Sequence, residues 1–181
     1  VVTLEVAGQL TKGHDGVVSN KEIMQKSLKE FLDKSTSPYH AVQEVRALLD
    51  TAGFIESEEG DPKNTKGNHY IINDGSLIAW IIPDQISPDS GLSIAAGHTD
   101  SPNLRLKPVL KGEQFGLKQF GVEVYGGSLL NTWLDRDLGI SGRIVTSRGG
   151  VLTERLIKID SGVCRIPQLA IHLDRNVNEK G

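Results

Sequence analysis

The chain has 181 residues, of which 38% are hydrophobic and 24% are charged; this predicts one ordinary globular domain or two small ones and excludes collagen-like, disordered and coiled-coil chains. Its net charge of −3, with both signs interspersed, offers no basic surface for nucleic acid. Without a bilayer-spanning apolar run or a signal-peptide pattern we expect no membrane partner, and the single cysteine, Cys164, favours a reducing, cytoplasmic location.

Two helices are predicted near the start of the chain. Residues 1–18, with their scattered glycines, precede them as a flexible arm or a short hairpin. Ser19 and Glu22 have the spacing of a capping box, and the apolar residues that follow recur at helical spacing. Pro38 suits the first turn of a second helix, which we expect to end at Gly53.

Strands are predicted from Gly67 onward. Two apolar runs flank the turn signal 73–76 and predict a hairpin. The run 92–96 predicts a short strand in a buried sheet position. It leads directly into Gly97-His98-Thr99-Asp100, so metal-competent side chains are expected at the C-terminal tip of a core strand, where open α/β sheets bind ligands.

The pattern changes near residue 103. Beyond Pro102 short alternating segments are separated by glycine pairs, and no helical period is visible from about 104 to 165. We therefore expect 19–103 to belong to an α/β domain and 104–181 to a β-rich one.

His98 is the candidate metal ligand. A histidine binds zinc best when its second ring nitrogen donates to an acceptor, and the i, i+2 spacing lets Asp100 reach that nitrogen. Spacing alone equally permits a hydrogen-bonded loop histidine. A catalytic zinc takes about three protein ligands, whereas His14, His40 and His69 lack ligand spacing, and we expect no partner near His69.

Five segments in the same order resemble the signatures of the aspartyl aminopeptidase family of zinc metallo-aminopeptidases. The resemblance covers about residues 20–181 and leaves out residues 1–18. Its strongest part reads Gly-His-Thr-Asp-Ser-Pro at 97–102. The segments are 35–41, 97–108, 122–127, 133–138 and 165–173.

The resemblance implies the N-terminal part of an α/β/α metallopeptidase domain, followed by an inserted, β-rich dimerisation domain. It implies a homo-oligomeric enzyme that removes acidic N-terminal residues from peptides with two zinc ions per complete active site. His98 corresponds to a zinc ligand. Asp100 corresponds to the carboxylate that orients this histidine, and the resemblance places it among the catalytic residues. His172 corresponds to a substrate-binding histidine that reaches into a neighbouring subunit's active site.

The chain departs from the family in one respect. The family's bridging aspartate, its glutamate base with the neighbouring ligand, a further aspartate and the last histidine belong to motifs that do not occur within these 181 residues. At most one zinc ligand is therefore present, and we expect the chain alone to be inactive. We also expect both ends, Val1 and Gly181, to be artificial.

Several alternatives stay open. The enzyme could prefer neutral or basic N-terminal residues, or the chain could be a non-catalytic dimerisation module if its natural end lies near 181. By its apolar context alone, His172 is a buried structural histidine rather than a functional one. Asp135 and Asp137 could form an acid/base pair, although a structural ion-pair role is favoured.

Overall fold

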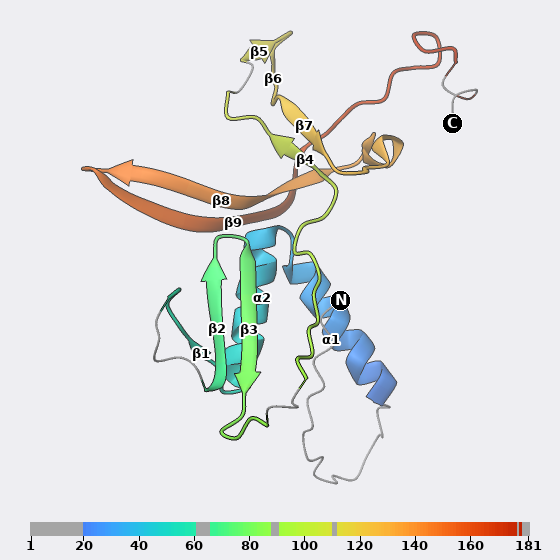
Figure 1. Ribbon diagram of the computed structural model, residues 1–181. Helices are drawn as coiled ribbons and strands as arrows, with labels where there is room; N and C mark the ends of the chain where they lie inside the picture. Colours follow the sequence, from blue (N-terminus) through green and yellow to red (C-terminus); the bar gives the residue numbers. More distant parts are fainter. Residues whose placement is uncertain (1–19, 61–65, 88–90, 110–111, 177, 179–181) are drawn as a thin grey trace, which may run out of the picture. The chain divides into compact units, whose positions relative to one another are not determined.

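The computed structural model describes residues 20–60, 66–87, 91–109, 112–176 and 178 (Figure 1). They form two compact units, each described here by itself. The first contains the described residues up to Asp100 together with Gly142–Leu156, and the second contains Ser101–Ser141 and the described residues from Ile157 onward. The arm predicted at 1–18, Ser19 of the capping box and His14 lie outside the described residues.

Both helices that the sequence predicts are present in the first unit. Helix α1 spans Asn20–Lys34 and helix α2 spans Pro38–Thr51. Ser37 caps α2, because its hydroxyl accepts a bond from the backbone N–H of His40 at 3.4 Å. Pro38 fits the first turn, where a missing N–H costs no helical hydrogen bond.

Helix α2 ends just before Gly53, as the sequence predicts. Gly53 has a φ of +80°, which favours glycine because an L side chain is rarely accommodated there. Its N–H donates to the carbonyl of Asp50, and the N–H of Phe54 donates to the carbonyl of Leu49. These two bonds form a Schellman motif, which satisfies carbonyls left unpaired by the helix end.

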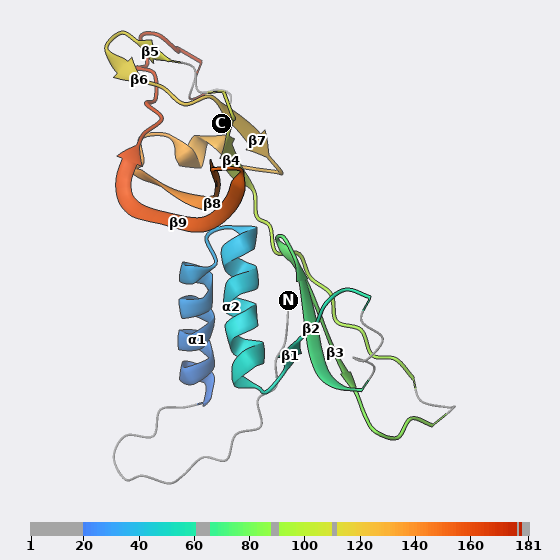
Figure 2. The same cartoon turned by 90° about the vertical axis from the view of Figure 1, so that its left-hand side faces the viewer.

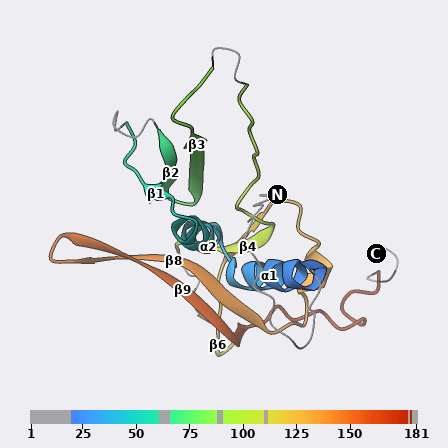
Figure 3. The same cartoon turned by 90° about the horizontal axis from the view of Figure 1, so that it is seen from below.

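A three-stranded sheet follows in the order β1-β2-β3. Strand β1 (Ile55–Glu56) pairs parallel with β2 (Gly67–Asn73), which pairs antiparallel with β3 (Ser76–Ile82). The predicted hairpin is thus confirmed. Its two-residue turn places Asp74 at a φ of +53°, which aspartate tolerates better than most residues. Helix α2 lies between α1 and this hairpin (Figures 2 and 3).

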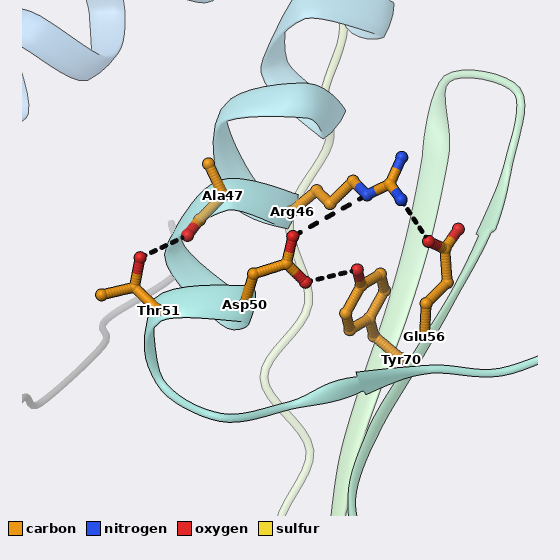
Figure 4. Close-up of polar contacts among 6 residues, drawn as sticks. All are labelled: Arg46, Ala47, Asp50, Thr51, Glu56 and Tyr70. Carbon is orange, nitrogen blue, oxygen red and sulfur yellow. Dashed lines mark hydrogen bonds and ion pairs between the residues drawn. The ribbon is translucent and has the colours of Figure 1, made fainter.

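The core of the first unit lies between α2 and the sheet. Its buried apolar side chains are Ala41, Val42 and Leu49 on α2 and Tyr70 on β2. Tyr70 is 1% exposed, and its hydroxyl donates to Asp50 Oδ1 at 2.6 Å (Figure 4). Burial raises the pKa of Tyr70 above its ordinary value, and the bond to Asp50 raises it further.

Arg46 extends this contact across the helix–sheet junction. Its guanidinium lies 2.5 Å from Glu56 Oε2 on β1 and 3.9 Å from Asp50 Oδ2 (Figure 4). All three side chains are about half exposed, so solvent screens these ion pairs and each contributes little by itself. The stabilising element is therefore the buried ring of Tyr70 with its hydrogen-bonded hydroxyl.

Two predictions about this unit are wrong. Residues 92–96 form no strand, and Leu92 and Ile94 are 86% and 79% exposed; a strand needs a neighbour for its backbone hydrogen bonds, and none of the described strands pairs with this run. His69 does have partners. It is buried within β2, where its ring nitrogens contact the Ser57 hydroxyl at 3.0 Å and the Lys66 carbonyl at 2.7 Å.

The second unit is rich in short strands, as its alternating sequence predicts. Strand β4 (Asn103–Leu106) pairs antiparallel with β7 (Val122–Tyr125), and β5 (Glu113–Gln114) pairs with β6 (Leu117–Lys118). A short 3-10 helix, η1, spans Leu130–Trp133.

The strands β8 (Leu138–Arg148) and β9 (Val151–Cys164) form a long two-stranded ribbon (Figure 1). Gly149 and Gly150 form its turn with φ values of +59° and +81°, the geometry that a two-residue hairpin turn with glycine at both positions adopts. The turn end of the ribbon, Gly142–Leu156, belongs to the first unit, and its base belongs to the second.

Removing one hydroxyl group tests the account of the core. Tyr70→Phe should lower the free energy of unfolding by about 1 kcal/mol, because a buried hydrogen bond is lost. Since the folded-state pKa of Tyr70 is raised, its contribution is complete below about pH 10 and is lost as the pH rises through the folded-state pKa. Urea unfolding near neutral pH and above pH 10 measures both effects.

Tyr39→Phe is the matched control, because it removes a hydroxyl while leaving the ring face on which Arg143 lies. The control variant should keep the alkaline loss of stability that Tyr70→Phe lacks. Equal stability of Tyr70→Phe and the unsubstituted protein would contradict a structural role for this bond.

Candidate functional site

The structure brings His98 and Asp100 together, as their spacing predicts. His98 Nδ1 lies 3.1 Å from the carboxylate oxygen Oδ1 of Asp100 and 2.7 Å from the backbone carbonyl oxygen of the same residue. The His98 side chain is 81% exposed. The imidazole is therefore fixed at one nitrogen while the ring remains accessible to solvent.

These contacts define which nitrogen of His98 could bind a metal ion. Both oxygens accept hydrogen bonds, so the neutral ring carries its proton on Nδ1 and its lone pair on Nε2. A carboxylate on the second nitrogen is the usual support of a zinc-bound histidine. His98 thus fits a zinc ligand through Nε2, with Asp100 orienting the ring. Whether it has this role stays a prediction.

The described part of the chain supplies only part of a zinc site. Among its residues there is no group of three or more histidine, cysteine, aspartate or glutamate side chains that could hold a metal ion. Because a catalytic zinc takes about three protein ligands, the described residues could contribute His98 but not the whole ligand set.

A contact that sequence reasoning missed fixes the backbone beside His98. The Thr99 hydroxyl donates to the carbonyl oxygen of Gly75, in the β2–β3 turn, at 2.7 Å. The two residues are 24 positions apart, and neither belongs to a pattern that would have predicted their pairing. Thr99 therefore connects the candidate metal motif to the hairpin.

The same turn is held by Arg143 of β8. The Arg143 guanidinium lies 2.6 Å from Asp74 Oδ1 and 3.2 Å from Glu154 Oε2 on β9, and it stacks over the Tyr39 ring at 4.4 Å. The hydrogen bond to Asp74 raises the pKa of Arg143 above its ordinary value. Arg143 and Asp74 are 69 positions apart, so local sequence patterns could not reveal this cluster.

His172 lies in the second unit, in a turn at 171–173, and its side chain is exposed. The interpretation of His172 as a buried structural histidine, which its apolar neighbours favoured, is therefore wrong in this structure. The turn is closed by a backbone bond from Leu173 to Ala170 at 2.8 Å. Its role in binding substrate stays a prediction.

Asp135 and Asp137 have structural contacts, as favoured from the sequence. Asp137 pairs with Arg165 at 3.1 Å, and Asp135 Oδ1 accepts a bond from the backbone N–H of Gln168 at 3.2 Å. Asp135 also donates its own N–H to the carbonyl of Ile166. These bonds hold the segment after η1 against the segment after β9.

None of the described helices combines the length and apolar character that crossing a membrane requires.

The family described as aminopeptidase I zinc metalloprotease (M18) matches residues 31–181 of the chain. Two curated relatives are similar over most of the chain. A probable M18 family aminopeptidase 2 of Streptomyces avermitilis is 47% identical over 85% of this chain and 35% of its own length, and an aspartyl aminopeptidase of Dictyostelium discoideum is 44% identical over 83% and 32%.

Solved structures are similar as well. A cryo-EM structure of a complex of Ape4 and Nbr1 matches with a TM-score of 0.78 and 38% identity, covering 85% of this chain and 30% of the solved one. The mApe1 dodecamer of Saccharomyces cerevisiae matches with a TM-score of 0.75 and 31% identity, covering 85% and 37%. The chain spans about a third of the length of the curated relatives it matches.

Proposed function

The chain belongs to the M18 family of zinc metalloproteases, and from this premise we propose that the full-length protein is an aminopeptidase that removes acidic N-terminal residues from peptides. The contact between His98 and Asp100 is the observation that carries this proposal, because it prepares a histidine for zinc within the motif that resembles the family's first metal signature.

The degree of similarity supports a preference for acidic residues. Relatives named as aspartyl aminopeptidases are 38–44% identical to this chain. A site for N-terminal aspartate or glutamate is therefore the better-supported alternative to one for neutral or basic residues.

His98 and Asp100 would act together on the metal. When bound, zinc supplies an activated water and polarises the scissile carbonyl. His98 would offer Nε2 as a ligand while Asp100 keeps the proton on Nδ1 and fixes the plane of the ring. Since the described residues offer no complete ligand set, we propose two zinc ions held mainly by residues of the full-length protein that this chain does not include, and no activity for this chain alone.

The β-rich residues 104–181 are proposed as part of a dimerisation domain in a cytoplasmic homo-oligomer. The dodecameric state of the related mApe1 structure supports an oligomer. In such an assembly, the exposed His172 would be available to bind peptide substrate in a neighbouring subunit, as the family resemblance implies.

Metal loading and activity of the full-length protein test this proposal together. We expect release of N-terminal aspartate or glutamate to exceed release of leucine or lysine, to stop with a chelator and to return with zinc. His98→Ala should lose activity and the zinc ion that His98 would bind, leaving the other, and Asp100→Asn should lose roughly 10- to 100-fold in affinity for that zinc. Zinc content by elemental analysis and peptide assays measure these effects.

The matched control is His14→Ala, because His14 lies outside the residues that match the family. It should keep the zinc content and activity of the unsubstituted protein. Aminopeptidase activity that resists chelation, or a His98→Ala variant with normal zinc content, would refute the role assigned to His98.

The role of His172 separates substrate binding from metal binding. His172→Ala should retain the full zinc content while turnover falls by roughly 100-fold or more, the loss that follows removal of one group that stabilises the transition state. Zinc analysis and steady-state kinetics on the same preparation distinguish the two. Loss of zinc in this variant would show that the assignment is wrong.

A further inference from the structure

We propose that the Asp74-Gly75 turn of the β2–β3 hairpin positions the candidate metal motif, and that Thr99 and Arg143 are positioning residues that act through this turn. The inference rests on the proposed function in one respect, since it takes His98 as a zinc ligand. It adds residues that do not touch the metal ion or the substrate.

Thr99 is hydrogen-bonded to the β2–β3 turn. Thr99 directly follows His98, and its hydroxyl donates to the Gly75 carbonyl at 2.7 Å in a half-buried position. The preceding residues, 91–98, are exposed and form no strand. The backbone before His98 is therefore not held by a sheet, and the bond from Thr99 restrains the motif on its other side.

The turn has a fixed position against helix α2. A side chain added at Gly75 would bring its Cβ to 3.0 Å from Pro38 Cβ and 3.8 Å from the Tyr39 ring. Such distances show that the turn lies directly on the first turn of α2. The carbonyl that receives the Thr99 hydroxyl is thus backed by a helix whose start is defined by the Ser37 cap and Pro38.

Arg143, on strand β8 of the ribbon, holds the turn from another side. Its guanidinium binds Asp74, the other residue of the turn, and covers the Tyr39 ring beside Pro38. The Arg143 side chain is 21% exposed and the Asp74 side chain is 67% exposed, so solvent screens the charge of this pair and its geometry, at 2.6 Å, is what fixes the turn. One guanidinium therefore joins the turn, the start of α2 and, through Glu154, the neighbouring strand of the ribbon.

Together these contacts connect the ribbon to His98 in a continuous path. The path runs from Arg143 to Asp74, through the peptide to Gly75, and from its carbonyl to Thr99. Metal affinity depends on groups outside the ligand set that hold a ligand in its binding geometry. Loosening either end of this path should thus weaken zinc binding at His98 even though no ligand is changed.

The experiment measures zinc affinity of the full-length protein by competition with a chromogenic chelator, without substrate. Thr99→Val removes the hydroxyl and should weaken zinc binding roughly three- to tenfold, the effect of losing one hydrogen bond. Thr99→Ser keeps the hydroxyl and should restore affinity to within about twofold. The visible spectrum of the cobalt-substituted protein should shift in Thr99→Val and not in Thr99→Ser.

The Arg143 end of the path has its own matched pair. Arg143→Gln should weaken zinc binding, as Thr99→Val does. Glu154→Gln, which removes the negative charge of an Arg143 partner that does not belong to the turn, should leave the affinity within about twofold of the unsubstituted protein. In the double variant with Thr99→Val, the two effects should be less than additive, because both act through one turn.

The outcomes separate this inference from the proposed function. If His98→Ala keeps its zinc, the assignment of the ligand fails and the positioning path fails with it. If His98→Ala loses zinc while Thr99→Val binds zinc as tightly as the unsubstituted protein, only the positioning role is overturned. A Thr99→Val variant with a lower melting temperature but unchanged zinc affinity would likewise overturn it, since that is the result of a purely structural role.

Discussion

The packing of helix α2 against the β2–β3 hairpin is the contact on which the first unit depends. The buried apolar side chains named for its core all come from these two elements, and Tyr70 is the largest of them. A buried phenol needs a hydrogen-bond partner, and Asp50 on the last turn of α2 provides it. The contact therefore fixes the hairpin relative to the helix. It also fixes the β2–β3 turn, whose Gly75 carbonyl accepts the hydrogen bond from the Thr99 hydroxyl.

The candidate metal motif occupies an unusual setting in this unit. The residues before it are apolar yet exposed, with Leu92 and Ile94 uncovered by any described strand. Apolar runs of this kind are typical of strands buried on both faces of a sheet. The geometry of His98 and Asp100 is nevertheless defined locally, because the acceptors of His98 Nδ1 all belong to a residue two positions away. Such a local pair can keep its arrangement without the neighbouring strand.

The sequence predicted what short-range chemistry decides. The ends of α2, the two-residue hairpin turn and the proximity of Asp100 to His98 depend on residues within a few positions of one another. The strand at 92–96 was wrong because its existence depends on a distant partner, and a run of apolar residues cannot reveal whether one is present. The bonds from Thr99 to Gly75 and from Arg143 to Asp74 were missed for the same reason. They join ordinary polar residues across long stretches of chain, with no spacing rule to identify them.

We propose that His98 binds zinc through Nε2 while Asp100 holds Nδ1. Crystals of the full-length protein loaded with zinc, measured on both sides of the zinc absorption edge, test it most directly. We expect an anomalous peak about 2.0–2.1 Å from Nε2 of His98, with the Asp100 carboxylate still at Nδ1. An ordered His98 with no zinc peak within about 3 Å of Nε2, or with zinc bound to Nδ1, would contradict it.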